Sequence, residues 1–340
     1  MKRKPRQLRG MLIVVAAVLV AVPLNAQVAP PEAQRISLQI ATGPASGSYL
    51  RLGETIAKIV SHPPGLARCD VPGVCGPEGL IATLRSSSGS VANVIAVNSG
   101  RVRSAIVQGD VAAAAFRGAG PFKQTGPLTE MRAIARLHEE TIHLVVASRS
   151  RIRKLADLVG KRVAIDGLRS ATNHTARLLF DAAQVNPARI KLSLESPERA
   201  AEALRNGKLD AFFAIGVAPI PVVDGLVRRG QARVVGVDAR AIAALSRANP
   251  MFGRYVLPGD SYRSSKAVAT LNVATVWVVQ KSLPDDVVHS ILRSLWNPAN
   301  RGDLRRLGKI AATIDASKAA ENLPLPLHPG AERFYAEAGR

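Results

Sequence analysis

Loops rich in glycine and serine are the parts of this sequence that could do chemistry. Each loop follows a short apolar run and precedes a stretch with helical periodicity. The first turn of a helix has unpaired backbone N–H groups and the positive end of the helix dipole, so an anion suits this position. Glycine lets a ligand approach the backbone closely. The serine hydroxyls that would add donors are Ser46, Ser48, Ser88, Ser90 and Ser170.

These loops predict a site for a carboxylate or a similar anion. In open α/β sheets, ligands bind in the crevice beyond the carboxyl ends of the strands, and the loops fall at such ends. Loops from both halves of the chain would then converge on one pocket with an electropositive lining. The alternative is that their Gly and Ser residues only cap helices and shape turns.

Motifs for catalysis are absent from the sequence after residue 26. It contains no G-x-S-x-G, S-x-x-K, H-E-x-x-H or C-x-x-C segment and no phosphate-binding G-x-x-x-x-G-K. We therefore expect no catalytic residue, no metal and no cofactor. The histidines, none of them in a paired metal spacing, are assigned solvated or structural roles: His62, His138, His143, His174, His289 and His328.

The two cysteines, Cys69 and Cys75, lie in the segment ARCDVPGVCG. An even pair at short spacing in an exported chain suggests a disulfide that closes a small loop. A metal site is the alternative, but no further Cys or His is adjacent at ligand spacing.

Strands and helices alternate along the chain, which is typical of α/β proteins with mostly parallel sheets. Asp110, after the strand that ends at Gln108, is interpreted as a helix cap and not as a ligand contact. The pattern restarts beyond residues 143–148. Predicted strands are 35–41, the run ending at Arg85, the run ending at Gln108, 209–215, 232–238 and 271–280; predicted helices include 49–60, 90–98 and 285–296.

The restart predicts two lobes, each a mostly parallel sheet flanked by helices. Lobe 1 would contain residues 35–142 and 271–340, and lobe 2 residues 148–268. Strands near 143–148 and 271–280 would cross between the lobes and act as a hinge.

The N-terminus has the order of a secretory signal peptide. Five basic residues precede the apolar run 11–22, and small Ala26 stands at a plausible cleavage position. A retained membrane anchor is the alternative, but the run is shorter than the ~20 residues that a span needs. We predict that residues 1–26 are removed and that the mature protein is soluble and periplasmic.

The formal net charge is +21, and removing five basic residues with the signal leaves about +16. Nucleic acid is the first partner to consider for such a balance. However, Lys and Arg are scattered along the chain, and aromatic residues, which would stack on bases, are only 4%. A general positive field that attracts acidic solutes or an anionic membrane surface fits better.

Six segments in order resemble the TAXI-type solute-binding receptors of TRAP transporters. They are GSYLRLGETIAKIV, SSGSVANVIAVNSG, AIVQGDVAAAA, LADLVGKRVAI, NGKLDAFFAIGVAP and LPLHPGAERFY. The similarity runs from about Ile36 to Tyr335. It implies a two-lobed periplasmic-binding-protein fold (type II-like) that captures small, often carboxylate-bearing solutes and delivers them to a membrane permease.

The resemblance also implies contact residues. Gly47, Ser48 and Tyr49 match a loop whose backbone amides and phenol meet the ligand. The other positions that match family motifs are Ser90, Asn93, Gln108, Ser170, Thr172, Gly216 and Pro219. The sequence departs from the family's pattern at Leu50, Arg51 and Ala171.

Several of these residues have alternative roles. Arg169 could clamp a carboxylate in a bidentate fork or lie solvated at the surface. Tyr49 could anchor its helix to the core, Asn93 could point to solvent, and Gln108 could cap the backbone.

The function expected from the sequence is that of a receptor for an organic or amino acid, with TRAP permease subunits as partners and no nucleic acid. The same fold could instead present its solute to a membrane sensor. A periplasmic enzyme that depends on Ser48 or Ser170 is the third hypothesis.

Overall fold

The computed structural model describes Met1 and residues 35–65, 69, 71, 73–262 and 266–339. The predicted signal segment and its cleavage position after Ala26 lie outside the described residues, apart from Met1. Among the described residues, no helix has the length and apolar character that crossing a membrane requires. From Gln34 onward the chain forms one compact unit.

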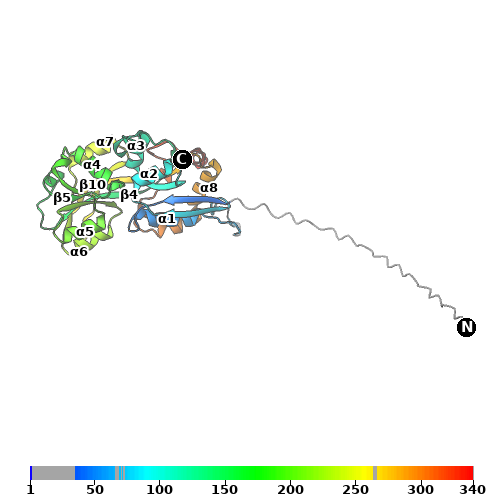
Figure 1. The fold of residues 1–340 in the computed structure, drawn as a ribbon, viewed down its shortest axis with the longest axis horizontal. Helices are drawn as coiled ribbons and strands as arrows, with labels where there is room; N and C mark the ends of the chain where they lie inside the picture. The colour runs from blue at the N-terminus through cyan, green and yellow to red at the C-terminus, as the bar shows by residue number, and fades with distance from the viewer. Residues whose placement is uncertain (2–34, 66–68, 70, 72, 263–265, 340) are drawn as a thin grey trace. The chain divides into compact units, whose positions relative to one another are not determined.

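A mixed sheet runs through the described chain in the order β2-β1-β3-β10-β4-β7-β5-β6, with β8 paired to β4 and β9 to β10 (Figure 1). β1 is parallel to β2 and β3, and β5 is parallel to β6 and β7. The strands are β1 (Ile36–Ala41), β2 (Leu80–Arg85), β3 (Ser104–Gln108), β4 (Met131–Ala147), β5 (Arg162–Ala164), β6 (Lys191–Ser193), β7 (Ala211–Gly216), β8 (Ala232–Val235), β9 (Phe252–Leu257) and β10 (Val268–Gln280).

Helices flank the sheet. The α-helices are α1 (Ser48–Val60), α2 (Ser90–Asn98), α3 (Gly109–Arg117), α4 (Ala171–Ala182), α5 (Pro197–Arg205), α6 (Pro221–Arg228), α7 (Ala239–Ala248), α8 (Asp285–Leu295), α9 (Arg301–Arg305) and α10 (Pro329–Glu337). Short 3-10 helices are η1 (Gly120–Phe122), η2 (Leu155–Leu158), η3 (Pro187–Arg189), η4 (Gly259–Tyr262), η5 (Pro298–Asn300), η6 (Ala311–Thr313) and η7 (Ala316–Lys318).

Each face of the sheet is buried under helices. α2, α3, α4 and α7 share one apolar cluster on one face, and Figure 1 shows them above the strands. On the other face, α1, α8 and α10 form a second cluster, and α5 and α6 form a third. Successive residues of a strand point to opposite faces, so Ile106 and its neighbours Ala105 and Val107 belong to different clusters. The first cluster continues across both parts of the sheet.

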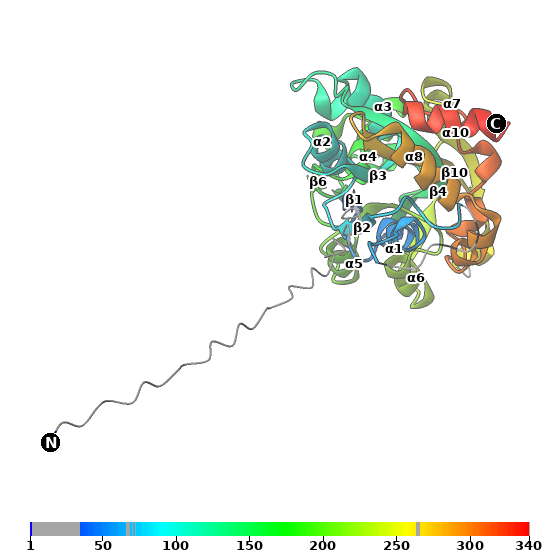
Figure 2. The same ribbon diagram turned by 90° about the vertical axis from the view of Figure 1, so that its right-hand side faces the viewer.

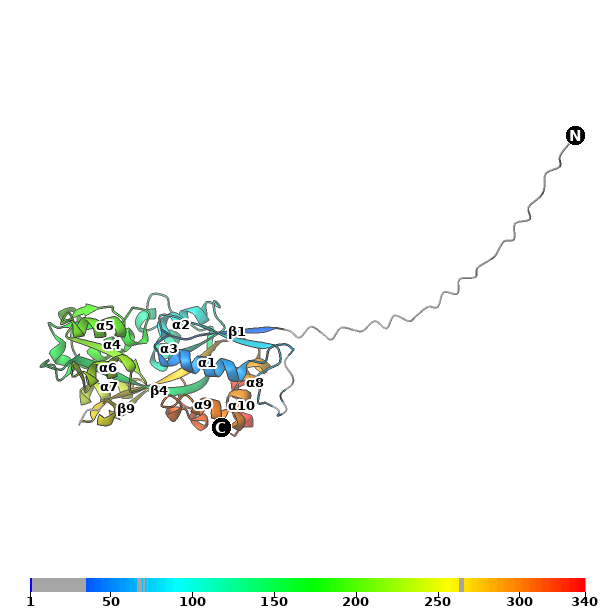
Figure 3. The ribbon, with the colours of Figure 1, turned by 90° about the horizontal axis from the view of Figure 1, so that it is seen from below.

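The long strand β4 connects the two parts of the sheet. Its residues 131–141 pair with β10, and residues 141–146 pair with β7. Thr141 is the point of change, because it pairs with Asn272 on one side and with Gly216 on the other. Figure 3 shows β4 between α4, α5, α6 and α7 on one side and α1, α8 and α10 on the other. We use the names lobe 1 and lobe 2 for these parts; their predicted bounds stay a prediction.

The C-terminal helices are fastened to lobe 1. α8 and α10 lie side by side (Figure 2), and an ion pair of 2.8 Å joins Arg333 Nη2 to Asp286 Oδ1. The Tyr335 hydroxyl donates a hydrogen bond of 2.8 Å to the carbonyl oxygen of Ile134 on β4. The chain end is therefore bonded directly to the crossing strand.

Cys69 and Cys75 are joined by a disulfide between α1 and β2. Directly after it, Gly76 packs against the end of α1, where a Cβ atom would overlap the carbonyl oxygen of Val60. The chain therefore packs closely on the end of α1 at the residue that follows the disulfide.

The mixed α/β class predicted from the sequence is confirmed. The helix predicted at 90–98 is α2, and Gly100 follows it with a left-handed φ of +73°. One interpretation was wrong: α3 begins at Gly109 with Gln108 as its N-cap residue, so Asp110 lies inside the first turn. The sequence did not lead us to β6, β9, α7, α9, α10 or the first part of β4.

Candidate functional site

Turns from both lobes meet beside the point where β4 changes partner. Those of lobe 1 follow β1, β2 and β3, and those of lobe 2 follow β5, β6 and β7. The strands of each set are parallel, so their carboxyl ends lie at one edge. Hydrogen bonds between the lobes join Ser46 to Glu198, Ala92 to Arg169, Gln108 to Thr175, and Thr175 to Asp110.

The turn after β1 brings two predicted donors onto one buried carboxylate. Gly47 is the N-cap residue of α1, which places Ser48 and Tyr49 in the first turn. The Ser48 hydroxyl donates to Glu140 Oε1 at 2.6 Å, and the Tyr49 hydroxyl donates to Glu140 Oε2 at 3.1 Å. Burial, and next the Glu140 charge, raise the pKa of Tyr49 well above its usual value. Tyr49 therefore stays a neutral donor.

His138 lies on the same face of β4 as Glu140 and contacts the same serine. Its Nε2 atom is 3.2 Å from Ser48 Oγ, and its Nδ1 atom is 2.9 Å from Thr275 Oγ1. The Thr275 hydroxyl also donates to the carbonyl oxygen of His138 at 2.9 Å. The ring is thus held between Ser48 of α1 and Thr275 of β10.

The turns after β2 and β3 are held together by Ser90, Asn93 and Gln108. The backbone N–H of Gln108 donates to Ser90 Oγ at 2.9 Å. Asn93 Nδ2 donates to the carbonyl oxygens of Thr42 (2.6 Å) and Ile106 (2.9 Å), so it joins the ends of β1 and β3. These two bonds use both N–H groups of the amide nitrogen. Asn93 Oδ1 is buried and has no hydrogen-bond partner among the described residues.

Gln108 spans the two lobes. Its Nε2 atom donates to Asp110 Oδ1 at 2.6 Å and to Thr175 Oγ1 on α4 at 2.8 Å. Thr175 in turn donates to Asp110 Oδ2 at 3.0 Å. These side chains are almost completely buried, and Gln108 Oε1 has no hydrogen-bond partner in the described part of the chain. The carbonyl end of this amide is thus left as a free acceptor.

Backbone contacts close the lobes on each other. The Ala92 N–H donates to the carbonyl oxygen of Arg169 at 3.3 Å. Gly89 has a φ of +117°, and a Cβ atom there would lie 3.1 Å from the Ser170 Cα. The Ser170 hydroxyl accepts from Asn173 N at 3.1 Å, so it caps α4. The structure is therefore a closed arrangement at these turns.

Ser46 closes a second point of contact, where its hydroxyl donates to Glu198 Oε1 on α5 at 2.6 Å. Burial alone would raise the pKa of Glu198, but hydrogen bonds, first that from Ser46, outweigh burial and hold this pKa below its usual value. Glu198 therefore stays charged as the partner of Ser46.

The remaining predicted residues lie at the edge of this arrangement. Gly216 and Pro219 flank Val217, which packs against the apolar cluster that contains Tyr49. Thr172 is buried in the first turn of α4. The side chains of Ser88 and Arg169 are exposed at the surface.

The side chains do not supply the electropositive lining that we expected. The ionisable groups buried at the meeting turns are the carboxylates of Asp110 (1% exposed) and Glu140 (5% exposed) and two histidines. Positive potential at these turns comes from backbone N–H groups at the helix starts. Among the described residues, no group of three or more His, Cys, Asp or Glu is placed to hold a metal ion.

Sequence reasoning missed the partners of the predicted residues. Glu140 and His138 belong to a part of β4 that carries many charged residues and that we did not predict as a strand. Thr175 lies one helical turn after the predicted Thr172 and makes the contact between the lobes. Residues 137–141 are Leu, His, Glu, Glu and Thr, which do not alternate between apolar and polar, so this part of the strand carries no periodic signal.

His143 is linked through Tyr262 to the turn that follows β7. It is fully buried on β4, and its Nε2 atom is 3.0 Å from the Tyr262 hydroxyl, which accepts from Ile220 N at 2.8 Å. Burial lowers the pKa of His143 to about 4. The ring is therefore neutral at ordinary pH.

Asn93→Ala should lower the free energy of unfolding by about 2–4 kcal/mol, because two buried carbonyl oxygens lose their donor. Urea unfolding at neutral pH measures this change. Asn206→Ala, at an exposed asparagine after α5, is the matched control and should stay within about 0.5 kcal/mol. An effect of Asn93→Ala no larger than that of the control would contradict the bracing role.

His143 should make the protein less stable in mild acid. Its folded pKa, about 4, is below the unfolded value of ~6.5, so only the unfolded state takes up the proton between these values. The free energy of unfolding should then fall by about 2 kcal/mol between pH 7 and pH 5 from this residue alone. Urea unfolding of wild type and His143→Gln isolates the effect, and equal losses in both proteins would show that His143 does not contribute.

The chain is similar to the periplasmic binding protein BugD (TM-score 0.51, 12% identity, 89% of this chain and 97% of that chain). It is also similar to the alkanesulfonate-binding protein SsuA from Xanthomonas axonopodis pv. citri bound to MOPS (TM-score 0.45, 14% identity, 89% and 85%). A third is the periplasmic aliphatic sulphonate-binding protein SsuA from Escherichia coli (TM-score 0.44, 14% identity, 84% and 81%).

At these identities the likeness shows the fold alone, which is the two-lobed fold of periplasmic binding proteins. The model of the NMT1-like family matches residues 40–339. The chain belongs to the NMT1-like family.

Proposed function

We propose that this protein is a periplasmic receptor that binds a small carboxylate-bearing solute between its two lobes. The observation that carries the proposal is the Gln108–Thr175–Asp110 network, in which buried polar groups from both lobes meet at the starts of α3 and α4. Burying polar groups costs free energy, and apolar packing alone can hold two lobes together. A buried polar network between the lobes therefore supports a role in binding. The family and the fold support the same role.

Binding would proceed by closure of the lobes. β4 and β10 are the strands that run between them, and the described structure is closed at the turns. A solute that contacts both lobes favours this closed state over an open one by its additional contacts. The unpaired atoms Gln108 Oε1 and Asn93 Oδ1 are acceptors that a solute would satisfy.

The buried carboxylate of Glu140 restricts the chemistry of the solute. It already accepts from Ser48 and Tyr49, the donors predicted for a solute carboxylate. The carboxylate of the solute would therefore bind to backbone N–H groups, and a second group of the solute would donate to Glu140 or Gln108. An amino acid or a hydroxy acid has both groups, so we place the solute in this class.

The affinity needs several of these contacts together. A micromolar Kd corresponds to about 8 kcal/mol. One exposed helix terminus contributes about 0.3–1 kcal/mol to the binding of an anion. Direct hydrogen bonds and the exclusion of water on closure must supply the rest.

The transport partner is proposed from the sequence motifs. They resemble TAXI-type receptors, which points to TRAP permease subunits, with export by a signal peptide cleaved after Ala26. Genes for TRAP membrane subunits beside this one would support the assignment. An adjacent sensor gene without permease genes would support presentation of the solute to a sensor instead.

We propose binding without catalysis, although Ser48 and His138 are adjacent. The nearest acceptor of the Ser48 hydroxyl is Glu140 at 2.6 Å, whereas His138 Nε2 is 3.2 Å away. His138 is oriented by the hydroxyl of Thr275 and not by a carboxylate, unlike the histidine of a Ser-His-Asp triad. Ser170, the other candidate nucleophile, caps α4.

A solute panel tests the proposed function. Protein purified without dialysis is first weighed by native mass spectrometry, and mature protein is then screened by thermal unfolding with amino acids, hydroxy acids, plain carboxylates and aliphatic sulfonates. At 100 times Kd, a true ligand should stabilise the folded state by about 2.7 kcal/mol. Stabilisation by sulfonates alone would refute the carboxylate assignment, and no co-purified mass together with no shift would refute the receptor role.

Gln108→Ala should weaken the solute found in that panel by about tenfold or more, because a buried contact between the lobes and a free acceptor are both lost. Isothermal titration calorimetry measures the change. Gln124→Ala, at an exposed glutamine, is the matched control and should bind as wild type does. Equal affinities of the two variants would place the solute elsewhere.

A further inference from the structure

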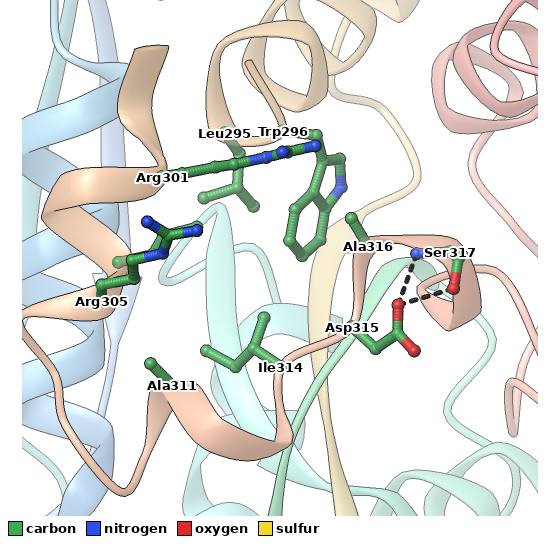
Figure 4. Close-up of a pocket in the computed structure, with 10 residues that line it drawn as sticks. Leu295, Trp296, Arg301, Arg305, Ala311, Ile314, Asp315, Ala316 and Ser317 are labelled. Atoms are coloured by element: carbon green, nitrogen blue, oxygen red, sulfur yellow. Dashed lines mark hydrogen bonds between the residues drawn. The ribbon is translucent and has the colours of Figure 1, made fainter. Parts of the chain in front are cut away.

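A cavity lies in the segment that follows α8. It has a volume of about 420 Å³, and its walls come from the end of α8, from α9 and from the chain between Ala311 and Ser317 (Figure 4). None of the turn residues described above lines it. It is therefore a site separate from the meeting point of the lobes.

Apolar side chains form the base of this cavity. Trp296, 9% exposed, follows α8 and stands against Leu304 and Ile314, which pack on the core of lobe 1. In Figure 4 the indole ring lies between Arg301 above and Ile314 below. The far wall is fixed to β4, because Glu139 N donates to Thr313 Oγ1 at 3.0 Å. The cavity is thus preformed and of the size of a small-molecule site.

Two guanidinium groups at its rim have no partner among the described residues. Arg301 and Arg305 are the first and last residues of α9, so their spacing puts them on one side of the helix. Within the described residues, neither side chain makes a hydrogen bond or an ion pair, whereas the next residue, Arg306, is paired with Asp303. Figure 4 shows both arginines on the same side of the cavity. They are available to an anion from outside.

The acidic residue of the cavity already has partners in its own turn. Asp315 stands opposite the arginines in Figure 4 and accepts from the Ser317 backbone N–H (2.9 Å) and hydroxyl (2.6 Å). These hydrogen bonds lower the pKa of Asp315, and Lys318 Nζ is 3.7 Å from its other oxygen. Asp315 therefore does not compete for the two arginines.

A third donor at the cavity is unsatisfied. Trp296 Nε1 is buried and has no hydrogen-bond partner in the described chain. A buried donor without an acceptor is unfavourable, and satisfied indoles are the rule in protein interiors. The donors that the cavity offers over its apolar base are therefore the guanidinium groups of Arg301 and Arg305.

We propose that this cavity binds a small organic anion with a compact apolar body. The carboxylate would lie between Arg301 and Arg305, and the apolar body would lie against Trp296 and Ile314. Guanidinium groups suit this role because they bind carboxylates in a fork and stack on aromatic rings. Phenylacetate has both parts and fits the volume of the cavity.

Tryptophan fluorescence tests the proposal with phenylacetate as the probe and the neutral phenylacetamide as its match. Trp296 is one of two tryptophans, and the other, Trp277, is fully buried. We expect a saturable change in emission with phenylacetate, and this change should be absent in Trp296→Phe. Phenylacetamide should bind more weakly than phenylacetate by about tenfold or more. Saturation-transfer NMR on the phenyl protons provides a readout that does not depend on the indole. Equal binding of acid and amide would overturn the proposal.

Arginine variants assign the site. The double variant Arg301→Gln/Arg305→Gln should bind phenylacetate about tenfold more weakly, whereas Arg306→Gln, whose arginine does not line the cavity, should bind as wild type does. Gln108→Ala separates this site from the one between the lobes and should leave the phenylacetate signal unchanged. Unchanged binding by the double variant would overturn the proposal without bearing on the proposed function. Loss of the signal in Gln108→Ala would also overturn it, because phenylacetate would then bind between the lobes.

Discussion

The pairing of one buried strand with partners in both lobes is the constraint on which the rest of the structure depends. β4 pairs with β10 before Thr141 and with β7 after it, so the ends of two sets of parallel strands are brought to one place. The polar residues of β4 near this point, His138 and Glu140, are then buried and must find partners. They find them in Ser48 and Tyr49 of α1 and in Thr275 of β10, which are two other segments of the chain.

Burial of carboxylates at the meeting point sets the chemistry of the site. Glu140 and Asp110 are held by neutral donors, and the closed turns leave unpaired acceptors at Asn93 and Gln108. The arrangement differs from an anion site built on arginines, of which the only nearby predicted one, Arg169, is exposed. The contrast with the cavity beside α9 is direct, because there the surplus groups are donors. One chain thus offers two surfaces of opposite hydrogen-bonding character.

The sequence predicted where many residues of the site lie along the chain, but not which contacts they make. Ser48, Tyr49, Ser90, Gln108 and Ser170 stand where strands end and helices start, and this local pattern could be read along the chain. Their hydrogen-bond partners are up to 92 residues away in sequence. Asn93 shows the limit, because a polar residue near a helix start looks the same whether it faces a solute or joins two strand ends. Glu140 was missed because its strand lacks an apolar run.

The sequence by itself determined the alternation of strands and helices, the α/β class and the turns where a ligand could approach the backbone, because these depend on neighbours within a few residues. Only the tertiary structure decided that β4 would be continuous from Met131 to Ala147, since pairing on both sides compensates for its charged residues. It alone also decided the sign of the buried charge between the lobes and the unpaired arginines beside Trp296. These properties follow from which distant side chains meet, and spacing along the chain does not record that.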